Sequence, residues 1–400
     1  MGGEDTIVES EPFVHITYGT TSSCDRTMKV MSENEPNVRA LDTSKIEARQ
    51  DGNHDVFVSF LIPVYNAERD LPKALDSIVQ QDDGTIEIIC VNDGSKDGSG
   101  KVLEEYSQRY PFIHVFTQEN QGITCARNAA LAQATGEWLC FVDNDDIVAE
   151  HAVKVFHQTA EPDLDIVYYD YEKFITDMPD QSGNQISSTR TFEGKDIVKL
   201  QSDCINRFRG NVPLVPHKSM PTPWAKIYRR EFLAAHGLQF NPKVKHEEDV
   251  VFNFEVLSYC KKVKKVDYIS YFYRWSVNSE SHRYRPYILE NTQCTLEAYK
   301  NIVDRRYSER KDIVMLYQYR ILWELLYCVV LGPMHPQNPK SYQERKKQFF
   351  ALLNEPIFKG IFSRVKTTKF EFKQSVLATL IKLRWFWLLN QLGRVVVKAR

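Results

Sequence analysis

The stretch VFVSFLIPVYNAERDLPKALDSIVQQDDGTIEIICVN, residues 56–92, decides the fold. It begins with an apolar run at 56–64, continues with an amphipathic pattern at 68–81 and returns to an apolar run at 86–92. Strands that are apolar on both faces and separated by helices are typical of a parallel sheet covered by helices on both sides. We therefore predict a doubly wound α/β sheet that begins near Val56.

The same alternation continues along the chain as far as residue 143. We predict helices at 96–110 and 123–134 and strands at 112–118 and 137–143. Sheets of this kind bind ligands at the carboxyl ends of their strands. The polar motifs PVYN, NDGSKDGS and DNDD follow the first, second and fourth strands, so we expect the functional site at that edge.

After residue 150 the alternation weakens. The patterns predict a strand at 165–174, loops over 175–222, a helix starting at 224–238, a second helix at 248–260 and an aromatic-rich strand at 264–275. Beyond about residue 284 the chain has helical periodicity. We divide it into a disordered polar tail at 1–55, an α/β domain at 56–283 and a helical region at 284–400.

Bulk properties narrow the functional classes. The formal net charge of −2 argues against a nucleic-acid binder that relies on bulk electrostatics. The eight cysteines have no regular spacing, which favours reduced thiols in a cytoplasmic protein. The first residues lack a signal-peptide pattern, and the longest apolar run, at 321–331, is too short to span a bilayer and contains Glu324.

Three carboxylates gather in FVDNDDIV, residues 141–148, where Asp143, Asp145 and Asp146 surround Asn144. Side chains alternate along an extended segment, so Asp143 and Asp145 are expected to point the same way and to share a divalent cation. Hard oxygen ligands suit Mg²⁺ or Mn²⁺. The alternative is a solvated turn after a strand, where Asp is common.

Six motifs together resemble one enzyme family. They are, in chain order, PVYNAERDLPKALDSI, VNDGSKDGSG, ENQGITCARNAAL, FVDNDDIV, WAKIYRREFL and HEEDVVF. Over about residues 57–283 the chain resembles the family 2 glycosyltransferases, which are inverting enzymes of the GT-A fold. The resemblance implies a nucleotide-sugar donor, with a UDP-sugar expected, a saccharide or lipid-linked saccharide acceptor, Mn²⁺ or Mg²⁺, and a bacterial surface-polysaccharide pathway.

The nucleotide is expected at the first two strand ends. A carboxylate at Asp93 can accept a hydrogen bond from a nucleobase, and Asp93 matches the nucleotide-binding Asp of the family. The alternative is an Asp-Gly turn. Pro63, Tyr65 and Asn66 lie at the adjacent strand end, where Tyr65 can stack on the base or where the chain simply turns into a helix.

The resemblance also assigns roles around the acidic run. It implies that Asp145 coordinates the metal, that Asp143 faces the ribose or sugar, and that Asn144 is the variable middle position. Arg127, on the helix after Gly122, can hold an acid of the run or reach the nucleotide. The alternative for Arg127 is a surface salt bridge.

The motif HEEDVVF supplies candidate catalytic residues. Glu248 and Asp249 precede an apolar helical run, where carboxylates are favoured as N-terminal residues in any case. Asp249 matches the catalytic base of the family, with Glu248 beside it. His246 is a candidate metal ligand, although a surface position is the commoner outcome for such a histidine. Trp224 and Lys226 match a position near the acceptor, with a core position as the alternative for Trp224.

The segment YFYRWSVNSESHRY, residues 271–284, resembles one that closes over the diphosphate. It provides Arg274, Ser279 and Ser281 as candidate phosphate contacts and His282 as a candidate metal ligand.

The carboxyl-terminal segment 359–400 is strongly basic. It holds ten Lys or Arg and one acid, Glu371, and it includes Trp385, Phe386 and Trp387. A basic amphipathic helix with interfacial aromatics can lie on an anionic membrane, which would place the protein peripherally on the inner face of the cell membrane. The alternative is a helix packed on the catalytic domain with a solvated basic face. An oligomer is compatible with either.

Two other functional classes share features with this chain. A sugar-phosphate nucleotidyltransferase also uses a doubly wound sheet and Mg²⁺, but it needs a Gly-rich basic loop after the first strand, which PVYNAERD is not. A non-catalytic carbohydrate-binding protein on the same fold would not need Asp93, Asp145 and Asp249.

Overall fold

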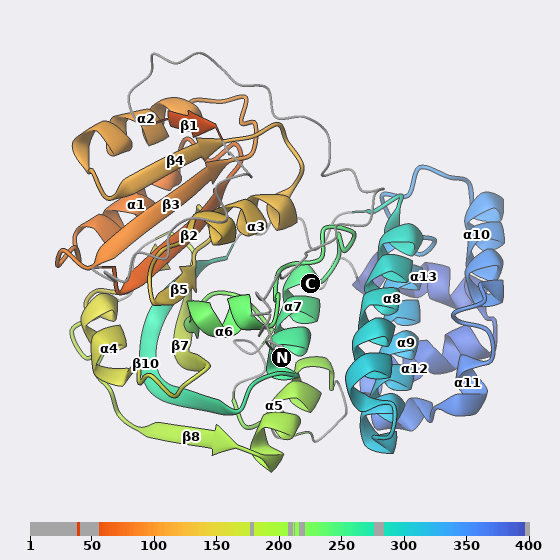
Figure 1. Cartoon of the computed structure of the whole chain (residues 1–400). Helices are drawn as coiled ribbons and strands as arrows, with labels where there is room; N and C mark the ends of the chain where they lie inside the picture. Colours follow the sequence, from red (N-terminus) through yellow and green to blue (C-terminus); the bar gives the residue numbers. More distant parts are fainter. Residues whose placement is uncertain are drawn as a thin grey trace, which may run out of the picture.

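The structure is a computed structural model in which an α/β sheet and a helical region lie side by side (Figure 1). It describes residues 38–40, 56–176, 180–206, 211, 213–215, 221–275 and 284–396. The two parts share one apolar core, because side chains from one face of the sheet and from the carboxyl-terminal helices form a single continuous cluster. The helical region therefore packs against the sheet and stabilises it.

Among the described residues, the sheet has ten strands. Nine follow the order β1-β4-β3-β2-β5-β9-β7-β10-β6, and β8 pairs with β10. The strands are β1 (Val38–Ala40), β2 (Val58–Val64), β3 (Ile86–Asn92), β4 (Ile113–Thr117), β5 (Trp138–Phe141), β6 (Ile147–Val148), β7 (Ile166–Phe174), β8 (Thr189–Glu193), β9 (Lys226–Arg229) and β10 (Lys262–Arg274).

The first five strands of that order are parallel to one another. β9 runs antiparallel to both β5 and β7, whereas β10 is parallel to β7 and antiparallel to β6 and β8. The predicted mostly parallel doubly wound sheet is confirmed. β1 lies within the segment predicted to be disordered, and the predicted domain boundaries stay predictions.

Helices cover both faces of the sheet. They are α1 (Leu71–Val79), α2 (Ser99–Arg109), α3 (Ile123–Gln133), α4 (Ala152–Thr159), α5 (Lys195–Ile205), α6 (Arg230–Ala235) and α7 (Glu248–Leu257). Adjacent side chains of β2 point to opposite faces of the sheet. Leu61 packs in the apolar cluster that includes α3, α5 and α7. Phe60 and Ile62 pack in the cluster that includes α1, α2 and α4.

Two sequence predictions between 175 and 238 are wrong. The segment predicted as a helix from 224 begins instead as β9, because its backbone groups pair with β5 and β7 on either side, and only its later part, α6, is helical. The segment 175–222, predicted as loops, contains β8 and α5, and Phe192 and Leu200 are buried there. Tertiary pairing overrode the local pattern at both places.

The carboxyl-terminal part of the described chain is helical, as predicted. Its helices are α8 (Ile288–Tyr307), α9 (Lys311–Leu331), α10 (Tyr342–Asn354), α11 (Ile361–Arg364), α12 (Phe372–Lys382) and α13 (Phe386–Val396). α8 contacts α7 and α9 contacts α5, so this pair lies against the sheet domain, while α10, α11 and α12 contact α9 from its other side (Figure 1).

α9 is longer than the apolar run from which it was predicted. In the part of the chain that the structure describes, it is the one helix long and apolar enough to cross a membrane by length and composition. Its apolar window is 67% buried inside the protein, and Arg320 and Glu324 lie buried near its middle. α9 is accordingly a core helix of the described fold.

Candidate active site

The acidic run after β5 forms a turn. β5 ends at Phe141, and the Asp146 N–H donates to the Asp143 carbonyl oxygen at 3.2 Å. The expectation that Asp143 and Asp145 share one face of an extended strand is therefore wrong, because a turn abolishes the alternation of side chains. The neighbouring Asn144 donates from Nδ2 to the Pro63 carbonyl oxygen at 2.9 Å, which joins this turn to the end of β2.

Asp146 is the buried member of the run. Its carboxylate accepts hydrogen bonds from Tyr271 Oη and from the Arg274 N–H, each at 2.7 Å. Burial, followed by repulsion from Asp143 and Asp145, raises the Asp146 pKa well above its ordinary value. Tyr271 Oη also lies 3.0 Å from the Asp143 nitrogen, which donates to it. These bonds hold the acidic turn against β10.

Among the three acids of the run, Asp145 is the candidate ligand for a cation. It forms no ion pair with any side chain that the structure describes. Burial and the neighbouring charge of Asp143 raise the Asp145 pKa to about 6. The raised pKa means that ionisation of Asp145 is unfavourable in the absence of a cation. A hard divalent cation would stabilise the ionised carboxylate, so the oxygen donors of Asp145 fit Mn²⁺ or Mg²⁺.

Arg127 forms ion pairs with two acidic residues of the site, Asp143 and Glu248. It is 3% exposed and comes from α3. Its Nη2 donates to Asp143 Oδ1 at 2.8 Å and its Nη1 to Glu248 Oε1 at 3.4 Å. The surface salt bridge considered for this residue is wrong. Arg127 instead joins the end of β5 to the start of α7.

The start of α7 carries the candidate base. Glu247, with φ of 57°, precedes Glu248 and Asp249 in the first turn. Burial, and then repulsion from Glu248, raises the Asp249 pKa to about 7, with Arg127 acting in the opposite direction. A carboxyl group with a pKa near neutrality is suited to exchanging protons with a substrate hydroxyl.

Asp93 is almost fully buried, at 2% exposed. Its carboxylate accepts hydrogen bonds from Gln118 Nε2 at 2.7 Å and from the Gln121 and Gly122 N–H groups at 2.9 and 2.8 Å. A carboxylate offers about four acceptor positions, so about one stays available for a base. Asp93 also fixes the loop that leads into α3 and therefore Arg127. Its contact with a nucleobase stays a prediction.

The first two strand ends are tied together beside Asp93. The Asn66 N–H donates to Ser95 Oγ at 3.1 Å, and Asn66 Oδ1 accepts from the Lys96 N–H at 2.8 Å. Tyr65 remains 47% exposed at this edge. An exposed ring next to the loop that holds Asp93 is in position to stack on a base.

Trp224 and Lys226 lie under the site. Trp224 is buried and stacks on Tyr271 with ring centroids 4.9 Å apart and an interplanar angle of 4°. Its core position is thus observed. Lys226 is fully buried, and burial lowers its pKa to about 7. Its Nζ donates to the Trp224 carbonyl oxygen at 3.3 Å and to that of Thr222.

Arg274 connects the acidic turn to the start of α1. Its Nε donates to the Asp145 carbonyl oxygen at 3.1 Å, and its Nη1 lies 2.6 Å from Asp70 Oδ1. The other residues proposed from the same segment, Ser279, Ser281 and His282, lie outside the described residues.

Comparisons with known proteins agree with this geometry. Residues 59–237 match the model of "Glycosyl transferase family 2". The glycosyltransferase EpsJ of Bacillus subtilis (strain 168), described as uncharacterized, is 32% identical over 244 residues, which cover 60% of this chain and 68% of EpsJ. The chain belongs to glycosyltransferase family 2. It is a glycosyltransferase.

Other relatives of this family 2 enzyme extend the likeness beyond the sheet. The B. subtilis protein EpsH, which is also named as a glycosyltransferase, is 28% identical over 333 residues, or 82% of this chain and 92% of EpsH. The fold matches residues 1–349 of S. aureus TarS, solved with UDP-GlcNAc, with a TM-score of 0.59 at 17% identity, over 86% of this chain and 93% of that one.

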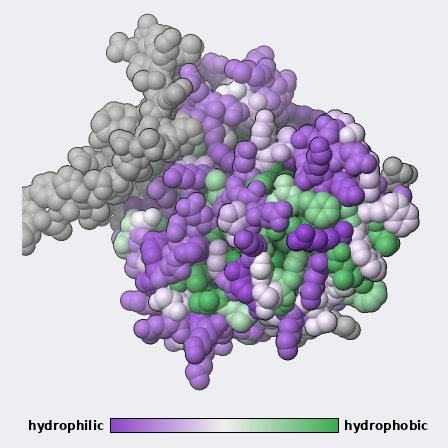
Figure 2. All heavy atoms as spheres, turned by 90° about the vertical axis from the view of Figure 1, so that its right-hand side faces the viewer, coloured by the Kyte–Doolittle hydropathy of each residue, from purple (hydrophilic) through white to green (hydrophobic). Residues whose placement is uncertain are grey.

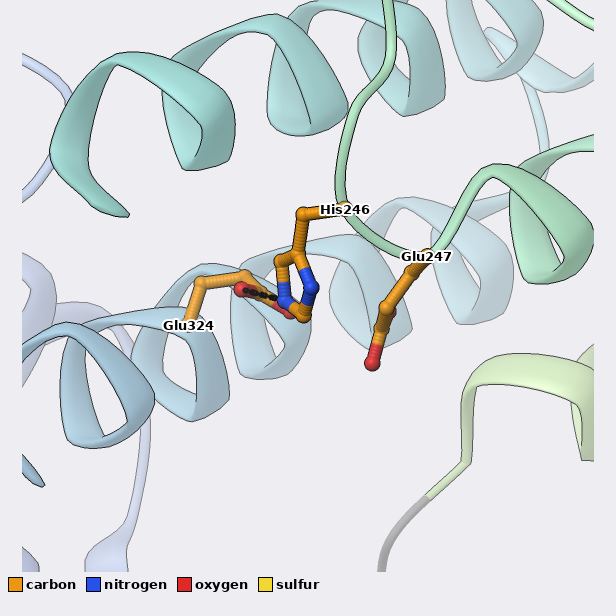
Figure 3. A group of neighbouring side chains, drawn as sticks. All are labelled: His246, Glu247 and Glu324. Carbon is orange, nitrogen blue, oxygen red and sulfur yellow. Dashed lines mark ion pairs between the residues drawn. The ribbon is translucent and has the colours of Figure 1, made fainter. Parts of the chain in front are cut away.

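One part of the site in this glycosyltransferase was missed by sequence reasoning. His246, a candidate metal ligand for which a surface position was the alternative, is 6% exposed. Its Nε2 lies 3.4 Å from Glu324 Oε2 on α9 (Figure 3). Its ring also stacks on that of Tyr327, with the ring centroids 4.5 Å apart. The sequence contained one signal, Glu324 within the apolar run 321–331, but it did not indicate that His246 is its partner.

Arg320 completes this buried cluster. Its Nη2 contacts the carboxylates of both Glu247 and Glu324. Burial opposes ionisation of Glu324, yet Arg320 and then His246 hold its pKa below the ordinary value. His246, Glu247 and Glu324 have the spacing of metal ligands (Figure 3), but the Arg320 guanidinium already supplies the positive charge. The cluster links α9 to the turn that precedes the candidate base.

Proposed function

We propose that this enzyme transfers a sugar from a nucleotide-sugar donor to a saccharide or lipid-linked saccharide, with inversion at the anomeric carbon. The observation that carries the proposal is the position of Arg127 between Asp143 and Glu248. This contact brings the donor-side acids after β5 to the start of α7, where Asp249 lies. The acids that bind the donor and the base that activates the acceptor hydroxyl can then act on the same sugar.

Asp249 is the base in this mechanism. Its carboxylate takes the proton of the acceptor hydroxyl while that oxygen forms a bond to the anomeric carbon. The bond between the anomeric carbon and the phosphate oxygen breaks, and the nucleoside diphosphate leaves with the electron pair. Attack opposite the leaving group, with no carboxylate acting as nucleophile, inverts the anomeric configuration.

Asp145 would hold the divalent cation. Mn²⁺ or Mg²⁺ held there would supply a positive charge that stabilises the departing diphosphate. Arg274, whose Nε donates to the Asp145 carbonyl oxygen, lies close enough to this position to contact a phosphate oxygen.

Asp93 and Tyr65 bind the nucleobase in this proposal, with Pro63 and Asn66 shaping their loop, and Asp143 faces the ribose or the sugar. A UDP-sugar is the donor to test first, since TarS, which shares the fold, was solved with UDP and UDP-GlcNAc. Trp224 and Lys226 are buried, so in this proposal they support the acceptor side from beneath and do not line it.

The relatives' names guide the choice of acceptor. One relative of this chain is named for minor teichoic acid biosynthesis (GgaB of B. subtilis strain 168) and another is a poly(ribitol-phosphate) beta-glucosyltransferase of Bacillus spizizenii. They are 26% and 28% identical over 312 and 221 residues. We infer a cytoplasmic enzyme of bacterial surface-polysaccharide synthesis.

The test is a panel of nucleotide sugars with Mn²⁺, scored by nucleoside diphosphate release and by the anomeric configuration of the product. Asp145→Asn and Asp249→Asn should each abolish transfer while leaving the far-UV circular dichroism spectrum unchanged. Wild-type transfer by both variants would overturn the assignment. Pyrophosphate release from a nucleoside triphosphate and a sugar phosphate would instead identify a nucleotidyltransferase.

A further inference from the structure

Exposed apolar side chains concentrate at the carboxyl-terminal end of the enzyme. Among the described residues, eleven large apolar side chains are exposed, and six of them fall between residues 372 and 388. These six are Phe372, Val376, Leu383, Trp385, Trp387 and Leu388. We call them the α12–α13 apolar surface. Figure 2 views the outer side of the helical region and shows apolar side chains reaching the surface between polar ones.

Packing imposes this exposure. The sequence suggested one amphipathic helix, but the chain breaks at Arg384, which has φ of 59°, and α12 and α13 pack separately. Phe386 turns inward and lies 5.2 Å from the Phe349 ring, and Leu389 is fully buried. With these two as anchors of α13, Trp387 and Leu388 are left on the outside.

The outward residues of α12 form a stripe. Phe372, Val376 and Leu383 are spaced by four and seven positions, which places them on one face of a helix. Phe372 is 74% exposed and Trp387 63% exposed. Large apolar side chains that gather on the exposed face of a helix indicate an interaction surface.

Basic residues surround the apolar surface. Between residues 359 and 392 the exposed Lys and Arg are Lys359, Arg364, Lys366, Lys369, Lys373, Lys382 and Arg384, and the exposed acid is Glu371. A second copy of this chain is a poor occupant, because a twofold contact would place this positive charge against itself. A partner with an apolar interior and a negative surface is complementary.

We propose that the α12–α13 apolar surface docks the enzyme onto a bilayer that contains anionic lipids. Phe372, Val376, Leu383 and Leu388 enter the acyl boundary. Trp385 and Trp387 lie at the level of the headgroups, where indole rings are favoured. The surrounding lysines and arginines contact lipid phosphates, and each contributes roughly a fivefold increase in partitioning onto an anionic surface. The docking does not depend on the donor or acceptor proposed above.

The test uses the full-length chain and two kinds of vesicle, one of phosphatidylcholine alone and one with about a third phosphatidylglycerol. We expect cosedimentation with the anionic vesicles, little with the neutral ones, and release at high salt. The double variants Trp385→Ser/Trp387→Ser and Lys373→Glu/Lys382→Glu should each lower partitioning at least about tenfold. The control Tyr287→Ser/Met315→Ser removes exposed apolar side chains elsewhere and should bind like the wild type.

Several outcomes would overturn the proposal. One is absence of wild-type binding to anionic vesicles, and another is undiminished binding by both surface variants. A concentration-dependent dimer that the Trp variant loses, without vesicle binding, would assign the surface to a second copy of the chain. Nucleotide-sugar hydrolysis in the absence of vesicles should be equal in all variants, so loss of membrane binding is distinguishable from failure of the proposed transfer.

Discussion

Arg127 donates from Nη2 to Oδ1 of Asp143 at 2.8 Å, although Arg127 lies on α3 and Asp143 follows β5. The same guanidinium reaches Glu248 at the start of α7. Because Arg127 is 3% exposed, its guanidinium is a buried charge that holds two acidic segments of the active site together.

Arg127→Met should therefore damage both stability and transfer. Loss of one partner leaves Asp143 and Glu248 uncompensated, which we expect to lower the free energy of unfolding by about 3–5 kcal/mol. Transfer should fall at least about 100-fold. Urea unfolding and initial rates measure the two effects. Arg127→Lys keeps the charge without the planar fork and should be intermediate. Arg109→Met, on the exposed end of α2, is the control, and equal behaviour of the two Met variants would contradict this role.

The rate of transfer should depend on the ionisation of Asp249. Its pKa of about 7 means that the deprotonated base accumulates as pH rises, so the rate should increase through about pH 7 and then level off. Glu248→Gln removes the neighbouring negative charge that helps to raise this pKa, so the acid limb of the profile should move to lower pH. A pH profile of kcat/KM from pH 5 to 9 measures the shift, and an unmoved limb in Glu248→Gln would refute the coupling.

Asp145→Asn should gain stability as it loses activity. The folded-state pKa of about 6 lies above the ordinary value of 3.8, so the protein binds this proton more tightly when folded. Stability is then lost as pH rises from the unfolded to the folded pKa. At pH 8 the ionised carboxylate costs on the order of 2–3 kcal/mol, a cost that is absent near pH 3.

Thermal unfolding at several pH values tests this. Asp145→Asn should melt higher than the wild type at pH 8, with no difference near the acid end, and it should lose the stabilisation that Mn²⁺ gives the wild type. The matched control is Asp163→Asn, because the hydrogen bond from Lys262 lowers the Asp163 pKa and its replacement should give no gain. A lower melting temperature of Asp145→Asn than of the wild type at pH 8 would show that the ionised Asp145 carboxylate does not destabilise the folded protein.

Arg320→Met should disturb the active site from α9. The substitution leaves Glu247 and Glu324 without their guanidinium, which should cost about 3–5 kcal/mol. Because Glu247 immediately precedes Glu248 and Asp249, kcat should fall more than KM rises. Adding Glu324→Met to Arg320→Met removes a buried charge and should recover part of the stability but not the rate. Recovery of both together would mean that the cluster acts on stability alone.

Local pattern predicted much of the fold. The apolar runs that became β2 and β3 and the amphipathic run that became α1 were recognisable because burial on both faces leaves little choice of residue type. β9 and the segment of β8 and α5 were not recognisable. β8 and β9 pair with β5, β7 and β10 from distant parts of the chain, and α5 packs on α7 and α9.

By itself the sequence determined which chemical groups reach the edge of the sheet: carboxylates after β3 and β5, and two more at the start of α7. Only the tertiary structure decided which of them are paired. Arg127 meets Glu248 across 121 residues, and Tyr271 meets Asp146 across 125. Asp143 is thereby paired with Arg127, and Asp146 with Tyr271 and the Arg274 N–H. Burial and neighbouring charges raise the pKa values of Asp145, Asp146 and Asp249. The physical reason is that burial and charge pairing depend on distances between elements, which local residue preferences do not specify.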